Sequence, residues 1–226
     1  MQTDNTLMRN TAIEDYYKAR RQAGLRDILA RLRGKQEDLI SYEEIQHKIK
    51  SWAILERGIQ TIPIDHIIGS VNRYQDFTRG FLPRQAISRD RWARVEQAMI
   101  QIGLPPIAVY QIGQVYFVKD GNHRVAIGKH LGWTHIEAHV EEVPSRVALT
   151  PDVNPDTLIL QAEYAGFLTS TRLLEVRPQA RLELTAPGQY PKLEAHISAH
   201  RPPVEEGNLS IDQIVGNWYD TVYLPT

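Results

Sequence analysis

The sequence predicts an α+β fold, in which a small mixed sheet and its helices lie between helical segments at both ends of the chain. Three observations support this prediction. Residues 114–131 have the pattern of a strand, a glycine turn and a helix. Residues 136–140 alternate apolar and polar side chains, as a half-buried strand does. Residues 10–33 repeat apolar side chains at nearly helical spacing.

We expect three parts along the chain. Residues 1–58 form an N-terminal helical segment, residues 59–145 form the core that holds the sheet, and residues 146–226 form a mainly helical C-terminal region. The 226 residues are enough for one or two domains with an ample core. Several prolines after Val143 mark the passage from the core to the C-terminal region.

The first predicted element is an amphipathic helix over residues 10–33, which ends at Gly34. Its apolar stripe consists of Ile13, Tyr17, Leu25, Ile28 and Leu32. Much of the remaining surface is cationic, through Lys18, Arg20, Arg21, Arg26, Arg31 and Arg33. Two interpretations stay open: this basic face contacts nucleic acid, or its side chains are solvated and pack their stems on a neighbouring element.

Further helices carry recognisable start signals. Residues 41–44 read Ser-Tyr-Glu-Glu, a capping-box pattern that predicts a second helix to about residue 50. Residues 157–175 also look helical, and residues 209–223 predict a last helix with Ser210 as its N-cap. The aromatic residues of that last helix are interpreted as packing anchors: Trp218, Tyr219 and Tyr223.

The strand–turn–helix pattern predicts a site for an anion. A strand over residues 114–118 leads into the turn Asp120-Gly121-Asn122, and a helix then runs to Leu131 with Gly132 as its C-terminal cap. Asn122 or Asp120 is the expected N-cap. Free backbone N–H groups and the positive end of a helix dipole meet at such a turn, so we expect it to bind a negative group.

His123 and Arg124 lie on the first turn of that helix, which makes phosphate the favoured anion. Arginine offers a planar set of donors that suits phosphate oxygens. The alternative is an ordinary Asp-Gly-Asn turn with two solvated side chains. The pattern is not a P-loop, because no Gly-Lys-Ser/Thr follows, and it lacks the G-x-G-x-x-G of dinucleotide-binding folds.

Residues 120–124, Asp-Gly-Asn-His-Arg, resemble the signature turn of the ParB/sulfiredoxin superfamily, in which a Gly-x-His-Arg or Gly-Glu-Arg-Arg turn opens a helix and holds nucleotide phosphates. The resemblance covers about residues 59–145. Residues 62–67 resemble the superfamily's opening strand, and residues 72–77 resemble the segment that follows it. Residues 91–102 resemble its next helix, residues 103–109 its Gly-x-x-x-Pro-Ile strand entry, and residues 136–140 its closing strand.

The chain departs from two branches of that superfamily. Sulfiredoxins have a cysteine directly before the His-Arg pair, whereas this chain has Asn122 and no cysteine anywhere. A carboxamide cannot act as a thiolate nucleophile, so sulfinic-acid repair is excluded. Partition-type ParB proteins have a second arginine where this chain has His123. The choice among kinase or ATPase, CTP switch and nuclease therefore stays open.

The resemblance implies a nucleoside triphosphate with Mg²⁺ as the ligand, together with hydrolysis or phosphoryl transfer. From their place at the turn we expect Asp120 and His123 to be catalytic and Asp120 to hold the metal, while Asp76 and Glu96 are weaker candidates for a general base. The expected nucleotide-binding residues are Gly121, Asn122, His123, Arg124, Arg73, Arg79, Pro105 and Pro106. Arg73 and Arg79 are expected to close over the phosphates.

DNA is the alternative partner, with a ParB-like regulator or nuclease using the same turn on a backbone phosphate. A second basic stretch, residues 73–94, interleaves arginines with aromatic residues, which suits a nucleotide or a single strand. A third possibility is an interaction protein without chemistry. The oligomeric state is not specified by the sequence.

Composition excludes several classes of protein. Lys and Arg number 26 against 27 Asp and Glu, so the net charge of −1 gives no general signal for nucleic acid. Without cysteine there are no disulfides or thiolate metal sites, which is compatible with a cytoplasmic protein. No apolar run approaches 18 residues, so we expect no membrane span, and the polar start lacks a signal-peptide pattern.

Two groups of histidines have the spacing of metal ligands. His135, Glu137 and His139 alternate along a predicted strand and would share one face. We favour the simpler interpretation that these side chains face solvent while the residues between them face the core. His196 and His200 lie four residues apart, but the glutamate of a zinc peptidase is missing.

Overall fold

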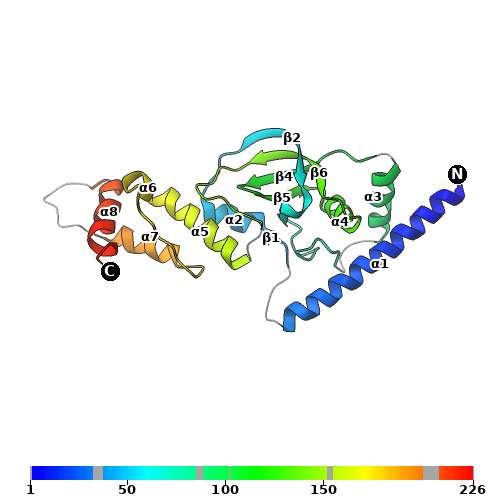
Figure 1. Cartoon of the computed structure of the whole chain (residues 1–226), viewed down its shortest axis with the longest axis horizontal. Coiled ribbons are helices and arrows are strands. Elements are labelled where there is room, and N and C mark those ends of the chain that lie inside the picture. The colour runs from blue at the N-terminus through cyan, green and yellow to red at the C-terminus, as the bar shows by residue number, and fades with distance from the viewer. Residues whose placement is uncertain are drawn as a thin grey trace.

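A computed structural model describes residues 2–32, 38–84, 89–101, 103–151, 155–200 and 209–225. The molecule is elongated (Figure 1). A sheet occupies its middle, a long helix runs diagonally along one side, and a group of helices forms the opposite end. The predicted end of the first helix, Gly34, lies outside the described residues, as do Arg33 and the side chain of Arg31.

The sheet is mixed, which confirms the predicted α+β fold with flanking helices. Its strand order is β1-β3-β5-β4-β6-β2. Neighbouring strands are parallel in β1·β3, β3·β5 and β4·β6, and antiparallel in β4·β5 and β2·β6. The strands are β1 Ile40–Ser41, β2 Leu55–Pro63, β3 Ile67–Ser70, β4 Ile107–Ile112, β5 Val115–Asp120 and β6 His135–Glu142.

The helices follow the predicted order. Ser41 caps its helix by accepting from the amide of Glu44, and Ser210 forms a capping box with Gln213, so both predicted caps are confirmed. A 3₁₀ turn covers Ile64–His66 and a π turn covers Tyr219–Tyr223. The α-helices are α1 Gln2–Leu32, α2 Tyr42–Ile49, α3 Arg89–Gln101, α4 Asn122–His130, α5 Pro155–Thr171, α6 Leu173–Val176, α7 Tyr190–Ala199 and α8 Ile211–Trp218.

Both faces of the sheet contribute to a hydrophobic core. One core joins the sheet to α1, α3, α4 and the aromatic pair Phe77 and Phe81. The second joins it to α2 and α5, with Phe117 of β5 at its centre. The inward residues of β6, Ile136 and Ala138 among them, are buried, whereas the histidines and glutamate between them are exposed. The predicted alternation of this strand is therefore confirmed.

The first helix buries a different face from the one its apolar stripe suggests. The buried side consists of small residues and one tyrosine: Ala12, Tyr16, Ala19, Ala23 and Ala30. The stripe is largely exposed, with Tyr17 at 44%, Leu25 at 64%, Ile28 at 57% and Leu32 at 79% exposed, while Ile13 is half-buried. Alanines let α1 lie close to α3, where Tyr16 meets the ring of Trp92 edge-on at 6.1 Å.

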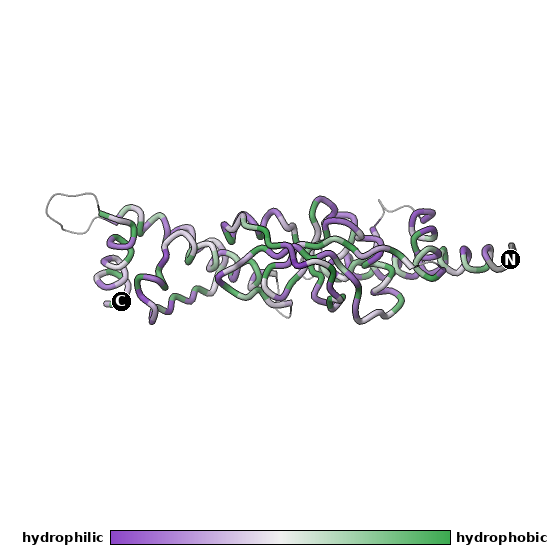
Figure 2. The backbone as a smooth tube through the Cα atoms, turned by 90° about the horizontal axis from the view of Figure 1, so that it is seen from above, coloured by the Kyte–Doolittle hydropathy of each residue, from purple (hydrophilic) through white to green (hydrophobic). Residues whose placement is uncertain are grey.

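An arginine from the basic stretch of residues 73–94 ties α1 to the core. The guanidinium of Arg84 donates to the carboxylate of Asp27 in α1 at 2.9 Å and also to that of Asp38. Seen from above, the N-terminal end of α1 extends beyond the rest of the molecule (Figure 2). Its N-terminal half is held as well, because Gln97 of α3 donates to Asn5 at 3.2 Å and Arg9 pairs with Asp90 at 3.4 Å.

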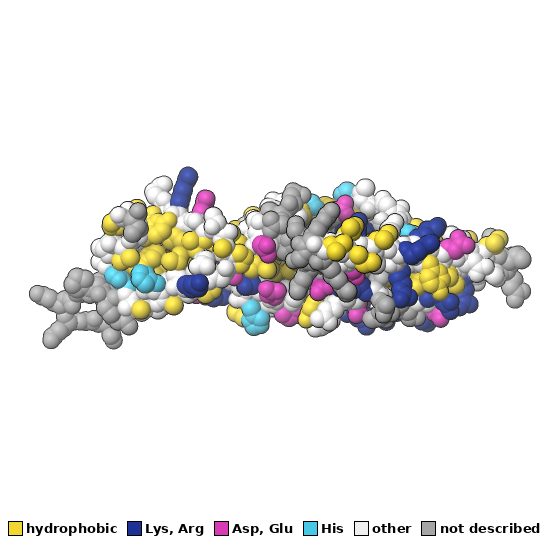
Figure 3. All heavy atoms as spheres, turned by 90° about the horizontal axis from the view of Figure 1, so that it is seen from below, with side chains coloured by type: hydrophobic (Ala, Val, Ile, Leu, Met, Phe, Trp, Pro, Cys, Tyr) yellow, Lys and Arg dark blue, Asp and Glu magenta, His cyan; other side chains and the backbone are white. Residues whose placement is uncertain are grey.

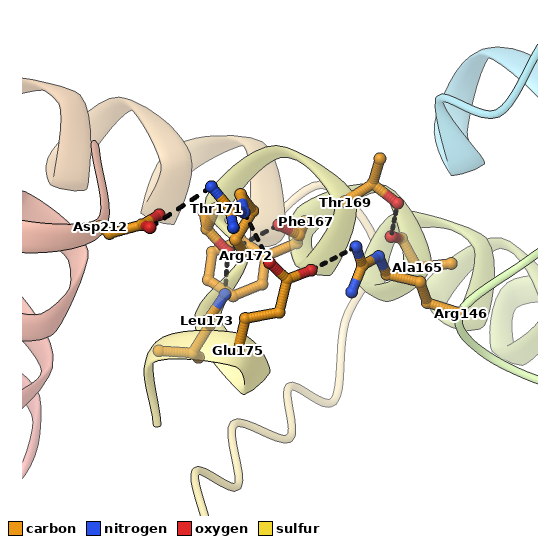
Figure 4. A network of polar contacts seen from close by, with 9 residues as sticks. All are labelled: Arg146, Ala165, Phe167, Thr169, Thr171, Arg172, Leu173, Glu175 and Asp212. Carbon is orange, nitrogen blue, oxygen red and sulfur yellow. Dashed lines mark hydrogen bonds and ion pairs between the residues drawn. The ribbon is translucent and has the colours of Figure 1, made fainter. Parts of the chain in front are cut away.

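The C-terminal helices pack around their own core, which contains the predicted anchors Trp218, Tyr219 and Tyr223. The helix predicted over residues 157–175 is divided at Arg172, whose φ of +54° separates α5 from α6. Figure 4 shows how charged groups stabilise this break: Arg172 pairs with Glu175 at 2.6 Å and with Asp212 at 3.3 Å. No helix in the described parts of the chain is long and apolar enough to cross a membrane.

Candidate phosphate-binding site

The predicted turn is formed by a glycine that no other residue can replace without strain. Gly121 links β5 to α4 with a φ of +111°, and a Cβ added there would lie 2.5 Å from Cγ2 of Ile107. Gly121 is itself the N-cap residue and no side chain caps this helix, so the prediction that Asn122 or Asp120 is the cap was wrong. The first N–H groups of α4 therefore lack a side-chain acceptor.

A pocket of about 500 Å³ opens at this turn. It brings together seven predicted site residues, although Arg79 is not among the residues that line it and Pro106 lines a neighbouring pocket. Pocket residues also come from the loop after β3 and from α3, so the site is assembled from distant segments. The lining consists of Val71, Asn72, Arg73, Arg91, Val95, Leu104, Pro105, Lys119, Asp120, Gly121, Asn122, His123 and Arg124.

The pocket is strongly cationic. Arg73, Arg91, Lys119 and Arg124 line it, against Asp120 as the carboxylate among its described lining residues. Lys119 is shared with its neighbours, because its ammonium pairs with Glu141 and lies 4.5 Å from the ring centroid of Tyr110. The excess of positive charge adds to the positive end of the α4 dipole, so the pocket favours an anion.

Two buried polar groups in the pocket wall lack partners. Asn122 is 6% exposed and His123 is 7% exposed, yet Oδ1 of Asn122 and Nε2 of His123 have no hydrogen-bond partner among the described residues. Buried polar atoms are nearly always bonded in folded proteins, so unbonded ones at a pocket wall indicate a place for a ligand.

His123 is held in its neutral form. Burial, followed by the charges of Arg91 and Arg73, lowers its pKa from 6.5 to about 4. The ring of Phe77 meets it edge-on at 5.6 Å and keeps it in place. A neutral imidazole carries one N–H donor and one acceptor nitrogen, so His123 can donate to an anion without first being charged.

Arg124 is largely engaged in holding the site together. Its guanidinium donates to the carboxylate of Asp120, to the carbonyl oxygen of Pro105, and to that of Pro106 at 3.0 Å. These bonds join the first turn of α4 to the loop before β4. In this arrangement Arg124 positions the pocket wall, while its charge still contributes to the potential inside.

The two weaker candidates for a general base lie outside the pocket lining. Asp76 forms an ion pair with Arg73 at 3.5 Å. Glu96 is 2% exposed beneath α1, where it accepts from Nε1 of Trp92 at 2.7 Å, and burial raises its pKa. Asp120 and His123 are therefore the two titratable candidates that the pocket contains.

The described residues offer few ligands for a metal ion. No group of three His, Cys, Asp or Glu side chains that could hold a metal occurs within the described ranges. His196 accepts from Nε1 of Trp218, and His200 lies 2.8 Å from the amide oxygen of Asn217, so both predicted C-terminal histidines have structural contacts. Mg²⁺ needs only one or two carboxylates when phosphates supply further ligands, and Asp120 fits that smaller requirement.

Among the cationic residues of the pocket, two were not predicted as site residues. Arg91 lies in the first turn of α3 and Lys119 lies near the end of β5, directly before Asp120. The sequence did place Lys119 beside the turn. The position of Arg91 depends on how α3 crosses α4, which no local pattern encodes.

Few known proteins are similar to this chain. No model of a known protein family matches the chain, and no curated protein matches it. A crystal structure of sulfiredoxin from Arabidopsis thaliana aligns with 41% of this chain and 89% of its own, at 20% identity and a TM-score of 0.29. We draw neither family nor function from a similarity of this size, so the ParB/sulfiredoxin resemblance of the sequence stays a prediction.

Proposed function

We propose that the pocket at the start of α4 binds the phosphate groups of a nucleoside phosphate. The observation that carries this proposal is the pair of unpartnered polar atoms in the buried wall, Oδ1 of Asn122 and Nε2 of His123. Both residues line a pocket with four cationic side chains at a helix N-terminus. An anion with several oxygens would accept from the backbone N–H groups, from the imidazole of His123 and, once its carboxamide is rotated, from the amino group of Asn122, as phosphates do at helix N-termini elsewhere.

The roles of the residues follow from their positions. Backbone N–H groups of the first turn of α4 and the imidazole of His123 donate to phosphate oxygens. Arg73 and Arg91, which also line the pocket, add positive charge. Leu104, Val71 and Val95 provide an apolar part of the lining against which a sugar can pack. The carboxamide of Asn122 can present its amino group to the ligand, since the two ends of a carboxamide exchange by rotation.

Chemistry on the phosphate is the second half of the proposal. Asp120 lies at the mouth with its side chain 80% exposed, where it can orient water or hold Mg²⁺. The ion would neutralise charge on the phosphates during hydrolysis or transfer. With a pKa of about 4, His123 is a weak base at neutral pH, so its main contribution is as a donor.

A binding panel tests this proposal. Pyrophosphate, ATP, CTP, GTP and UTP are each titrated into the protein with and without Mg²⁺, with calorimetry and thermal unfolding as readouts. A ligand at 100 times its Kd adds about 2.7 kcal/mol of stability. Release of phosphate is measured in the same samples to separate binding from hydrolysis.

Two arginines on α3 provide a matched pair of variants. Arg91 lines the pocket, whereas Arg94, one turn later, is exposed and donates to the carbonyl oxygen of Asp90. Arg91→Ala should weaken pyrophosphate binding about tenfold or more, in line with a charged contact of about 1.5–3 kcal/mol. Arg94→Ala should leave it unchanged. Failure of pyrophosphate and of every nucleotide to bind the wild-type protein would refute the proposal.

Nucleic acid is a second candidate because cations gather on one side of the molecule. Figure 3 shows Lys and Arg side chains along the α1 side, and Lys18, Arg21 and Arg26 of that helix are exposed. If a DNA backbone lies there, changing Arg21 and Arg26 to Gln should reduce the salt dependence of DNA binding by about 0.9 log units for each phosphate that is no longer neutralised. Pyrophosphate binding should not change in the same variant.

A further inference from the structure

A second pocket lies beside the phosphate pocket, on the other side of Arg124. It has a volume of about 300 Å³ and is lined mainly by apolar side chains, with Trp133 as its largest. The two pockets share three lining residues, namely Leu104, Pro105 and Arg124. The remaining residues that matter here are Met99, Pro106, His135, Ile136 and Glu137.

The indole of Trp133 lies against α4 at Gly128. A Cβ added to Gly128 would lie 3.1 Å from Cε3 of Trp133, so the absence of a side chain at that position lets the ring rest on the helix. Trp133 is nevertheless 40% exposed. A tryptophan with one side packed and the remainder open, facing two prolines, is suited to stacking with a planar ring.

Polar residues of this pocket lie at the start of β6, where β4 does not yet run beside it. Strand β6 begins at His135, but β4 begins only at Ile107, which is paired with Ala138. Residues 135–137 thus have no strand beside them on the β4 side within the described chain. Pro105 and Pro106 precede β4 and have no N–H to offer. Glu137 and His135 line the pocket at this open edge.

We infer that this second pocket binds a nucleobase, stacked on Trp133, whose phosphates occupy the pocket on the other side of Arg124. The inference rests on the proposed function, because it assigns the remaining part of the same ligand. The sugar lies between the two pockets, against Leu104 and Pro105, which line both. A carboxylate accepts two parallel N–H donors well, so Glu137 favours a base that presents an imino and an amino group side by side, as guanine does.

The test separates the base from the phosphate. Trp52 and Trp133 are the exposed tryptophans, whereas Trp92 and Trp218 are buried, so a Trp52→Phe protein reports mainly on Trp133 in quenching experiments. Guanosine, which carries no phosphate, should quench its fluorescence. Uridine, which lacks an amino group, should do so less at equal concentration. The quenching should vanish in a Trp52→Phe, Trp133→Phe protein.

Affinities of GTP and pyrophosphate provide the second readout. Trp133→Ala should weaken GTP binding about tenfold or more, toward the affinity of pyrophosphate, and leave pyrophosphate binding unchanged. Trp133→Phe should weaken GTP binding less, because phenylalanine still stacks, and Glu137→Gln should reduce the preference for guanosine over uridine. If Trp133→Ala fails to fold, Trp133→Phe and Glu137→Gln still test the base site.

The outcomes distinguish this inference from the proposed function. Pyrophosphate and GTP that bind equally tightly, or GTP binding that does not respond to Trp133→Ala and Trp133→Phe, would overturn the base site and leave the phosphate site standing. Absence of binding by either ligand in the wild-type protein would overturn both. Quenching by guanosine without any phosphate binding would support the base pocket and refute the phosphate pocket.

Discussion

The guanidinium of Arg124 in α4 donates to the carboxylate of Asp120, the last residue of β5, four positions earlier in the chain. The arginine side chain is 14% exposed and the aspartate side chain is 80% exposed, so the pair reaches from the wall of the phosphate pocket to solvent. Asp120 thereby neutralises part of the positive potential that would otherwise attract an anion. This relationship makes the acidic residue of the turn a restraint on phosphate binding in the absence of metal.

Asp120→Asn should therefore tighten pyrophosphate binding in metal-free buffer, by about two- to tenfold. The unfolding free energy should fall by no more than about 1 kcal/mol, because one partner of the pair is exposed. Asp65→Asn is the control, since Asp65 pairs with Lys129 of the same helix at 3.3 Å and its side chain is 88% exposed. Weaker metal-free binding by the Asp120 variant in calorimetry would contradict the expectation.

Gly121→Ala should destabilise the protein by about 1–3 kcal/mol through backbone strain, with an additional cost from the contact with Ile107. Gly132→Ala is a matched control: its φ of +78° is also left-handed, but nothing lies within 4 Å of an added Cβ. Urea unfolding of the two variants should show the larger decrease in stability at Gly121. Equal decreases would mean that the side chain of Ile107 moves away from the added Cβ without a loss of stability.

The imidazole of His123 should titrate with a pKa of about 4 in the free protein. Since this value lies below the ordinary 6.5, the unfolded chain binds more protons between the two values, and stability should fall as the pH drops from about 6.5 toward 4. A bound anion stabilises the charged imidazole, so sulfate should raise the pKa. NMR titration of the ring resonances with and without sulfate measures both values. A free-protein pKa near 6.5 would show that the ring is not buried.

Glu96→Gln should stabilise the protein at neutral pH. Burial, with a contribution from the charge of Asp15, raises the pKa of Glu96 above its ordinary value. Because the pKa of this carboxyl is raised in the folded protein, its protonated form stabilises the fold. That contribution to stability is lost as the pH rises through the folded-state pKa. Glutamine keeps an oxygen to accept from Nε1 of Trp92. Thermal unfolding should show a gain at pH 8 and little change at pH 4, while exposed Glu14→Gln shows neither.

Local sequence signals specified helix caps and strand alternation but not every boundary, because the strand expected over residues 62–67 is divided by the 3₁₀ turn Ile64–His66 between β2 and β3. Ser41 and Ser210 start their helices, and β6 has the expected alternation, because caps and alternating side chains depend on residues a few positions apart. The first helix shows the limit of such signals. Its leucines marked an apolar face, yet the alanines opposite are buried, because close approach to α3 selects small side chains over large ones.

In the site, too, features set by adjacent residues were predicted, whereas contacts between distant residues were not. The turn around Gly121 was predicted from adjacent residues. The partners of Arg124 were not, because Pro105 and Pro106 come from a loop 18 to 19 positions earlier, and an arginine at a helix start does not reveal that its donors are already engaged. The burial of His123 likewise depends on Phe77 and on α3, which lie far away in the chain.

The position of Arg124 between two pockets has a thermodynamic consequence. Any shift of this side chain when one pocket fills alters the wall of the other, so the two halves of a ligand would sense each other. Such coupling is reciprocal: if pyrophosphate changes the affinity for guanosine by some factor, guanosine must change the affinity for pyrophosphate by the same factor. One residue that lines both pockets would then set the cooperativity between the base and the phosphate.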